Sequence, residues 1–276
     1  MSVTTVVATR DRWSDLERTL PRHTGPVVLV DNGSSDGTPE RVRERFPEVT
    51  VIELGRNHGA VARNVGVQAA TTPYVAFADD DSWWAPGALA RAAELLERHP
   101  RMAVLAARVL VGEGERLDPV CAEMSSSPLP RPLDLPGPAI LGFVACGAVV
   151  RRDAFLHAGG FDTVVEFFGE EERLALDLAA AGWGLAYVDS VVAHHHPSSS
   201  RPPSTSRRAL GVRNALLTAV MRRPWPAVAA ITAEQLRTGR AGVLGAARAV
   251  PRLHRAVASR RTLPGDVEAQ LRLLAR

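Results

Sequence analysis

Three consecutive carboxylates, Asp79, Asp80 and Asp81, directly follow an apolar run at residues 74–78. Like charges this close repel one another unless a cation or a helix cap offsets them. A hard divalent cation prefers oxygen ligands, so the cluster predicts a Mg²⁺ or Mn²⁺ site whose remaining positions diphosphate oxygens could fill. In the competing interpretation Asp81 caps the helix that begins near Pro86, and the other two carboxylates are solvated.

A second acidic cluster, Glu170, Glu171 and Glu172, follows residues 167–169 at the predicted start of a helix. Acidic residues in a first helical turn are stabilised by the helix dipole, which would explain the cluster without any chemistry. Alternatively, one of these carboxylates removes the proton from a hydroxyl group as its oxygen attacks an anomeric carbon. One acidic cluster on a metal and another as a base are what an inverting sugar transfer requires.

Histidines and an arginine add further candidates. The run at residues 194–196 follows a predicted strand, so His194 or His195 could complete a metal shell or contact a diphosphate, or the run could be a surface feature. Arg63 lies in a predicted helix at residues 60–70. Its planar guanidinium could bind a pyrophosphate, or it could be solvated.

The elements that must position these residues alternate between strand and helix. Apolar runs predict buried strands at residues 3–8, 27–30, 49–54 and 74–78. Helices are predicted between and after them, the first opened by a capping box of Ser14 and Glu17. This alternation is typical of right-handed β-α-β units and a parallel sheet covered on both faces. Ligands bind beyond the carboxyl ends of such strands, where Asp31 and the first acidic cluster lie.

The second half of the chain is less regular. A segment at residues 112–140 is rich in Pro, Ser and Gly and is predicted to be a mobile excursion over the site. Further strands are predicted at residues 102–111, 141–150 and 185–192, with helices at 153–158 and 170–181. After a linker at residues 197–206, helices are predicted at 207–221, 226–238, 241–257 and 264–274.

Composition limits the class of protein. The 276 residues can bury a full α/β core, and no apolar run approaches the roughly 18 to 20 residues that span a bilayer. The N-terminus lacks the pattern of a secretion signal, and Cys121 and Cys146 show no metal-ligand spacing. We therefore expect a cytoplasmic protein without disulfides.

The net charge of +3 conceals a strong asymmetry along the chain. Residues 1–200 hold 18 Arg and 27 acidic residues, a balance of −9, whereas residues 201–276 hold 15 Arg and 3 acidic residues, a balance of +12. Arg-rich helices with Leu, Val and Ala on another face suit the anionic inner face of a membrane, which predicts peripheral association. The basic helices could instead form a lid or a homodimer contact.

Seven motifs occur in a characteristic order. They are VVATRDR at residues 6–12, VDNGSSDGT at 30–38, RNHGAVARNVG at 56–66, DDD at 79–81, GGFD at 159–162, FFGEE at 167–171 and GW at 182–183. With these motifs the chain resembles family 2 glycosyltransferases of the GT-A fold. The resemblance implies an α/β fold with a mostly parallel sheet, inverting transfer from a nucleoside-diphosphate sugar to an acceptor hydroxyl, and Mn²⁺ or Mg²⁺ as cofactor.

The resemblance and the charge asymmetry together predict a catalytic domain at residues 1–200 followed by a basic helical extension at residues 201–276. Within the catalytic domain, residues 1–111 would bind the nucleotide sugar and residues 112–200 the acceptor. The resemblance itself covers about residues 1–215, and neither the donor sugar nor the acceptor follows from it.

The resemblance also implies roles for individual residues. Thr9 and Asp31 would contact the nucleoside, with Asp31 facing the base. Arg63 would lie on the nucleotide side, and Asp79 with Asp81 would match the acid-any-acid metal motif, Asp81 being the more direct ligand. The same motifs add three residues expected at the nucleotide sugar: Arg10, Asn57 and Asp80.

The second acidic cluster departs from the family pattern. Glu171 stands where the family usually has the aspartate that acts as base, and its additional methylene would shift the carboxylate by about 1.5 Å. Either the acceptor lies slightly farther away, or Glu170 or Asp162 serves instead. Arg173 stands where a second acid is common in the family, so acceptor binding would also differ.

Two other classes of function compete with this interpretation. A sugar nucleotidyltransferase would have a glycine-rich N-terminal loop with lysines at the phosphates. This chain instead has TRDR at residues 9–12 and contains no lysine. A glycan- or nucleic-acid-binding protein is the non-catalytic alternative, since clustered arginines can contact nucleic acid. The extension has only Trp225 among aromatic residues and no zinc-ligand spacing, so we expect no nucleic-acid partner.

Overall fold

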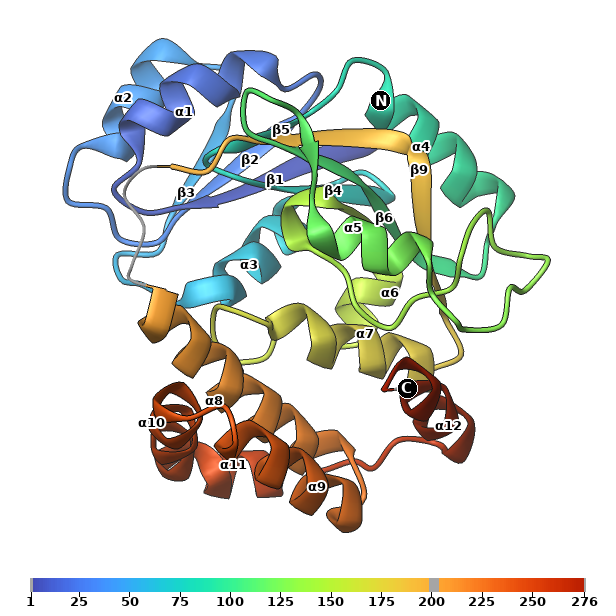
Figure 1. Ribbon diagram of the computed structural model, residues 1–276. Coiled ribbons are helices and arrows are strands. Elements are labelled where there is room, and N and C mark those ends of the chain that lie inside the picture. The colour runs from blue at the N-terminus through green and yellow to red at the C-terminus, as the bar shows by residue number, and fades with distance from the viewer. Residues whose placement is uncertain (1, 199–203, 276) are drawn as a thin grey trace.

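The computed structural model describes residues 2–198 and 204–275, and a nine-stranded sheet forms the centre of residues 2–198, the α/β domain (Figure 1). The strand order is β3-β2-β1-β4-β8-β6-β9-β5, and β7 pairs with β6. The strands are β1 (Val3–Thr9), β2 (Val27–Asp31), β3 (Thr50–Glu53), β4 (Tyr74–Asp79), β5 (Ser82–Trp84), β6 (Met102–Val111), β7 (Arg116–Leu117), β8 (Ala148–Arg151) and β9 (Gly184–His195).

The N-terminal half of the sheet is parallel, as the alternation of strands and helices predicts. β1 lies between β2 and β4, and β2 pairs with β3. In this register Thr9 lies opposite Asp31, and Ala8 lies opposite Asp79. The carboxyl ends of three strands therefore bring Thr9, Asp31 and Asp79 to one edge of the sheet. The helices of this half are α1 (Trp13–Thr19), α2 (Thr38–Arg45), α3 (Ala62–Ala69) and α4 (Ala88–Arg98), with short 3-10 turns η1 (Leu20–Arg22) and η2 (Gly59–Val61).

The C-terminal half of the sheet is mixed. β8 runs antiparallel to both β4 and β6, whereas β9 runs parallel to β6. The three-residue strand β5 directly follows the aspartate cluster and pairs antiparallel with the end of β9, so that Ser82 lies opposite His195. This pairing brings the histidine run beside the aspartates, although more than 100 residues separate the two in the sequence.

Helices cover both faces of the sheet (Figure 1). Successive residues of β1 pack into the two layers. Val6 packs with Phe77 and with residues of α3, α6 (Arg152–His157) and α7 (Glu170–Ala180). Val7 packs with Leu16 of α1 and Val42 of α2. This alternation is the two-residue period of a strand buried on both faces.

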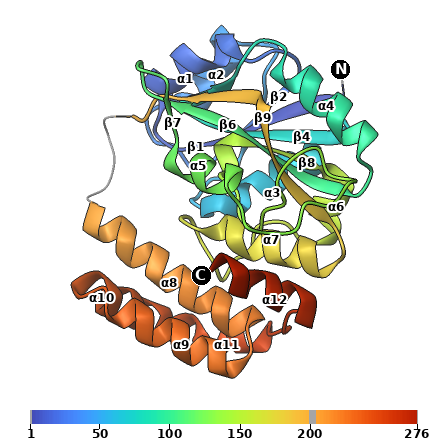
Figure 2. The same ribbon diagram turned by 45° about the vertical axis from the view of Figure 1, so that its right-hand side comes forward.

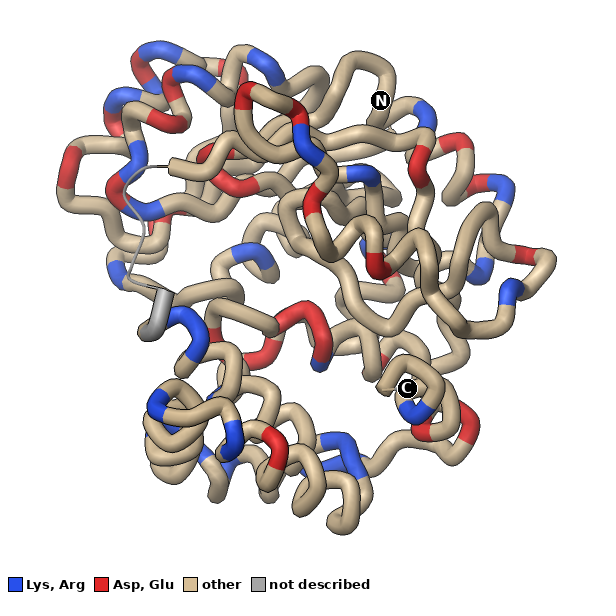
Figure 3. The backbone as a smooth tube through the Cα atoms, in the orientation of Figure 1, with Lys and Arg blue, Asp and Glu red and all other residues tan. Residues whose placement is uncertain are grey.

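In the described part of the chain, five helices follow the α/β domain, and of these α8 and α12 contact α7 (Figure 2). They are α8 (Ser204–Arg222), α9 (Trp225–Leu236), α10 (Arg240–Ala249), α11 (Leu253–Ala258) and α12 (Gly265–Leu274). α8 packs along α9, α10 and α11, while α12 returns to the α/β domain, where Val267 packs with Leu176 of α7. Basic residues predominate on these helices (Figure 3). Much of the linker predicted at residues 197–206 lies outside the described residues.

The capping box predicted at Ser14 and Glu17 is wrong. α1 begins at Trp13 with Arg12 as its N-cap, and the Arg12 side chain makes no capping hydrogen bond. Asp11, with a positive φ of 52°, turns the chain just before this point, so the helix starts earlier than the box requires.

Two other boundaries differ because single residues interrupt an element. The strand predicted at residues 141–150 is confined to β8 and follows a 3-10 turn, η3 (Ala145–Gly147). At Gly147 the chain passes so close to Val109 that a Cβ would lie 2.4 Å from its Cγ2. The helix predicted at residues 241–257 is divided into α10, η4 (Val250–Arg252) and α11, because Pro251 lacks an amide hydrogen.

The segment predicted as an excursion at residues 112–140 contains structure of its own. It forms β7 and a short helix, α5 (Pro119–Ser125), whose first turn is capped by the Asp118 carboxylate. Cys121 on this helix is completely buried, and both cysteines are free thiols. In the part of the chain that is described, no helix has the length and apolarity needed to cross a membrane.

Candidate active site

The three aspartates point in different directions at the end of β4. The Asp79 amide donates to Ser82 Oγ at 2.8 Å, which closes a tight turn between β4 and β5. Asp80 points back toward β1, where Thr9 Oγ1 donates to its Oδ2 at 3.1 Å. Asp81 is only 5% exposed and lies under the end of β9. The turn therefore separates Asp80 from the carboxylates on either side.

Asp79, Asp81 and His195 form a group that could hold a metal ion. Each offers one ligand atom, and these atoms all lie within 4.8 Å of one another. His195 Nε2 lies 3.3 Å from Asp81 Oδ1, which fixes the imidazole toward the aspartates. Two carboxylates and one imidazole suit a divalent ion such as Mn²⁺ and leave coordination positions for other oxygen ligands.

The structure does not bring His194 into this group. Its ring stacks on Trp83 at a centroid distance of 5.3 Å, and its Nδ1 lies 3.4 Å from a carboxylate oxygen of Glu115. His194 and His195 are consecutive residues of β9, so their side chains leave opposite faces of the sheet. Only one of the two predicted histidine ligands therefore lies beside the aspartates.

The crowding of the carboxylates has an electrostatic consequence. Burial and the charges of Asp79 and Asp81 raise the pKa of Asp80 to about 8. Three carboxylates on consecutive residues therefore do not all ionise easily without a compensating cation. This is the property expected of a site that accepts a divalent metal.

Arg63 connects the aspartates to the second acidic cluster. It is buried on α3; its Nη2 donates to Asp79 Oδ1 at 2.6 Å, and its Nη1 lies 3.3 Å from Glu170 Oε1. Burial alone would lower the pKa of Arg63, but the charges of Asp79 and Glu170 outweigh it and raise that pKa. Its Nε is buried and has no hydrogen-bond partner among the described residues. One guanidinium thus joins the two acidic clusters and keeps one donor unused there.

Glu170 and Glu171 differ in their contacts at the start of α7. Glu170 is buried, pairs with Arg63, and accepts the Phe168 amide at 2.8 Å. Glu171 accepts a longer bond from the Ala145 amide, at 3.2 Å. Burial and the neighbouring charge of Glu170 raise the pKa of Glu171 to about 8. A carboxylate with a raised pKa is better suited than one held in an ion pair to accept a proton.

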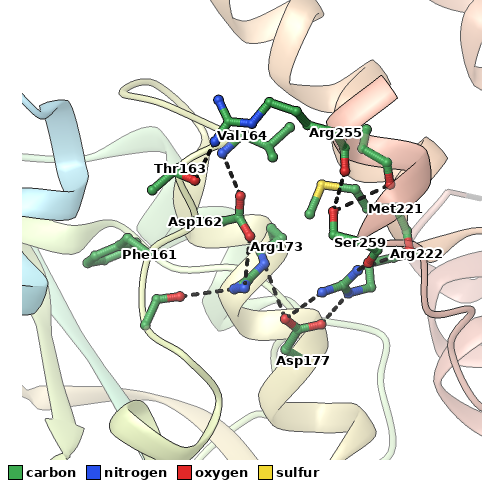
Figure 4. Close-up of polar contacts among 12 residues, drawn as sticks. Phe161, Asp162, Thr163, Val164, Arg173, Asp177, Met221, Arg222, Arg255 and Ser259 are labelled. Atoms are coloured by element: carbon green, nitrogen blue, oxygen red, sulfur yellow. Dashed lines mark hydrogen bonds and ion pairs between the residues drawn. The ribbon is translucent and has the colours of Figure 1, made fainter. Parts of the chain in front are cut away.

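Asp162, the third candidate base, is engaged elsewhere. One of its oxygens accepts the Val164 amide, and the other lies 3.3 Å from Arg173. Arg173 also contacts Asp177, which Arg222 of α8 holds with two nitrogens (Figure 4). The structure therefore places Asp162 in a network of charges between the α/β domain and the C-terminal helices.

The residues expected at the nucleoside lie around the loops after β1, β2 and β3. Asp31 is 2% exposed and accepts the amides of Gly33 and Ser34 at 3.0 and 2.9 Å, so it shapes the loop that follows β2. Arg10 is exposed and lies 3.6 Å from Asp11. Asn57 is also exposed, and its Oδ1 accepts a hydrogen bond from the Gly59 amide at 2.8 Å.

Two asparagines that the sequence analysis missed fasten these loops. Asn32 donates to the Gly59 carbonyl at 3.1 Å and accepts the His58 amide at 3.0 Å. Asn64 bonds both the amide and the carbonyl of Phe161, at 2.9 Å each. Both asparagines lie within sequence motifs, at residues 30–38 and 56–66, whose charged residues were the predicted site residues. Their position beside those charged residues is the signal in the sequence that could have identified them.

Comparison with known proteins provides an independent indication of function. The family model described as "Glycosyl transferase family 2" matches residues 4–158. The chain is similar to the N-acetylglucosaminyl-diphospho-decaprenol L-rhamnosyltransferase of Mycobacterium tuberculosis, with 29% identity over 65% of this chain and 69% of the relative. It is also similar to the pre-mycofactocin glycosyltransferase of the same organism, with 30% identity over 72% of this chain and 44% of that protein.

Solved structures show the same fold. The mannosyltransferase PcManGT from Pyrobaculum calidifontis, in complex with GDP-Man and Mn²⁺, aligns with a TM-score of 0.62 and 23% identity, covering 99% of this chain and 86% of that one. Residues 1–349 of TarS from S. aureus, in complex with UDP-GlcNAc, align with a TM-score of 0.57 and 18% identity, covering 80% and 67%. The predicted α/β fold of the GT-A type, with helices at the C-terminus, is confirmed.

Proposed function

Since the chain belongs to glycosyl transferase family 2, we propose that it transfers a sugar from a nucleoside diphosphate to an acceptor hydroxyl with inversion at the anomeric carbon. The observation that carries this proposal is the position of Arg63, which contacts Asp79 with one terminal nitrogen and Glu170 with the other. One guanidinium therefore joins the metal group to the start of α7, where the candidate base Glu171 directly follows Glu170.

At the donor end, Asp79, Asp81 and His195 would hold one divalent cation, Mn²⁺ or Mg²⁺, which would neutralise the diphosphate as it leaves. The unused Nε of Arg63 would donate to a phosphate oxygen. The Mn²⁺ named with the solved mannosyltransferase supports this choice of metal class. The nucleoside and sugar would contact the remaining residues of the donor site: Thr9, Arg10, Asp31, Asn57 and Asp80.

At the acceptor end, Glu171 would act as the base. A new bond forms between the acceptor oxygen and the anomeric carbon, the proton of that hydroxyl passes to the Glu171 carboxylate, and the bond from the anomeric carbon to the diphosphate breaks. Attack from the side opposite the leaving group inverts the configuration. Glu170 is less suitable because it is held by Arg63, and Asp162 because it faces Arg173.

The acceptor would be a sugar on a lipid diphosphate at a membrane surface. The name of the rhamnosyltransferase relative describes such an acceptor. On α9 to α11 several large apolar side chains are at least half exposed, which suits contact with a lipid surface; they are Trp225, Val243, Val250 and Val257. Co-sedimentation with vesicles of anionic lipid tests the proposed membrane contact, and absence of binding at low salt would exclude it. A homodimer formed through the same helices would instead be detected by analytical ultracentrifugation.

The proposal as a whole is tested by binding and then by transfer. Calorimetry with GDP, UDP and dTDP, each with Mn²⁺, Mg²⁺ or a chelator, should show one nucleoside diphosphate that binds only with metal. The matching nucleotide sugars are then assayed for release of that diphosphate with lipid-linked sugars. If no nucleoside diphosphate binds with either metal, the proposal is refuted.

A further inference from the structure

The loop that precedes α7, residues 162–169, is held by the C-terminal helices and not only by its own domain. We call it the pre-α7 loop. Arg252 of η4 donates to the Val164 carbonyl at 3.1 Å. Arg255 of α11 donates to Thr163 Oγ1 at 2.8 Å (Figure 4). Two arginines that the sequence assigns to a basic extension are therefore used within the molecule.

The same loop also supplies part of the apolar core of the extension. Val164 and Val165 are 4% and 0% exposed, and they pack with Leu217, Val220 and Ala256 of α8 and α11. Because apolar side chains of both parts are buried together, the helices and the loop cannot separate without exposing this core. The extension is thus attached to the catalytic domain at the segment that leads into the candidate base.

Asn214 of α8 makes the most specific of these contacts. It is 1% exposed, and its Nδ2 donates to the carbonyls of Glu166, Phe167 and Phe168, at 3.4 Å to Phe167 and 2.8 Å to Phe168. Arg213 Nε donates to Asn214 Oδ1 at 2.8 Å, which directs the amide nitrogen toward the loop. A single buried amide therefore fixes three consecutive carbonyls just before α7.

The backbone that Asn214 holds is in an unfavourable conformation. Phe168 has φ +84°, a region that side chains other than glycine rarely adopt. Such a residue keeps its conformation only where its surroundings enforce it. On one side the Phe168 amide donates to Glu170, which Arg63 also holds; on the other the Phe168 ring lies against Gly211 of α8, where a Cβ would come within 3.2 Å of it.

We infer that Asn214 is a positioning residue for sugar transfer. By holding the carbonyls of residues 166–168, it keeps Phe168 in its strained conformation and sets the direction in which α7 begins. The second acidic residue of α7 is Glu171, so the same contact sets where that carboxylate meets the acceptor. This inference rests on the proposed function in taking Glu171 as the base. It gives the C-terminal helices a role in catalysis that is separate from binding of the donor.

Two variants test the inference from the same helix. Asn214→Ala removes the three hydrogen bonds, and Gly211→Ala keeps them but presses on the Phe168 ring, without backbone strain in α8. Both variants should bind the nucleoside diphosphate and Mn²⁺ within twofold of the unmodified protein, while kcat falls by about tenfold to a hundredfold for Asn214→Ala and less for Gly211→Ala. Amide hydrogen exchange should quicken in residues 163–172 and stay unchanged in β1 to β4.

Arg223→Gln is the matched control. Arg223 directly follows the last residue of α8 and joins this end of the helix to α12 through 2.7 and 3.0 Å bonds to Glu268, but no described contact links it to the pre-α7 loop. It should lower the melting temperature and leave kcat and the exchange of residues 163–172 unchanged. Loss of kcat in the control to the same extent as in Asn214→Ala, or unchanged kcat and exchange in both test variants, overturns the inference. If the unmodified protein transfers no sugar, the proposed function fails, and the exchange comparison still decides whether Asn214 holds the loop.

Discussion

Glu171 is expected to give the transfer rate a steep dependence on pH. Its burial and the adjacent charge of Glu170 raise the pKa of Glu171 to about 8, and a base accepts a proton only in its ionised form. For a pKa of about 8 the ionised fraction is about one tenth at pH 7 and about nine tenths at pH 9. The value of kcat/KM, which reports the free enzyme, should therefore rise about tenfold between these pH values. A carboxylate with an ordinary pKa would be ionised throughout and give a flat profile.

The variant Glu171→Gln tests whether the pH dependence comes from ionisation of Glu171 and not from another titrating group. The amide oxygen can still accept the hydrogen bond from the Ala145 amide, so the start of α7 should keep its shape. Removing the base should lower kcat by about 10² to 10⁴ and leave the affinity for nucleoside diphosphate and Mn²⁺ unchanged. Glu172→Gln is the control, because it makes the same chemical change at an exposed neighbour on the same helix.

The assay measures diphosphate release from the donor at saturating metal and constant ionic strength, from pH 6 to 9.5. A flat kcat/KM profile combined with full activity of Glu171→Gln would refute the assignment. The same pair of measurements on Glu170→Gln and Asp162→Asn would then identify the base. Full activity with a sloping profile would show that another group titrates in this range.

Two further predictions concern the metal and the core. Asp81→Asn should abolish the metal-dependent part of nucleoside diphosphate binding in calorimetry, whereas Asp189→Asn, at an exposed acid, should leave it unchanged. Gly66→Ala should lower the melting temperature, because its Cβ would lie 2.4 Å from Val6 Cγ1 and overpacking costs about 1 to 3 kcal/mol, against about 1 kcal/mol gained in helix propensity. Gly114→Ala, where a Cβ would meet no atom within 4 Å, is its control, and equal melting temperatures for both variants would contradict the prediction.

The parallel half of the fold could be predicted because its information is local. Apolar β-branched runs mark β1, β2 and β4, and parallel strands with helical connections bring their carboxyl ends together. The sequence alone therefore predicts that Asp31 and Asp79 lie at one edge of the sheet. What local patterns cannot supply is the partner of a three-residue strand such as β5.

The choice between His194 and His195 illustrates this limit. The sequence shows a histidine run after a strand, and either residue could have been the ligand. The strand in fact continues to His195, and its pairing with β5 sets the register, so only His195 lies beside Asp81. A shift of one residue in that register would exchange the two side chains. Contacts between distant segments determine which histidine faces the aspartates, and these contacts cannot be predicted from the histidine run itself.

Ion pairs within the molecule change how the charge asymmetry of the sequence is interpreted. Counted along the chain, an extension with 15 Arg and 3 acidic residues points to an external anionic partner. In the structure, Arg213 and Arg252 lie beside Glu166, and Arg222 pairs with Asp177, so acids of the catalytic domain take up part of that charge. Less positive charge is then available for a lipid surface than the count suggests. Contact with a membrane would have to rely more on the exposed apolar side chains of α9 to α11, and it should depend on salt less steeply than the net charge of the extension predicts.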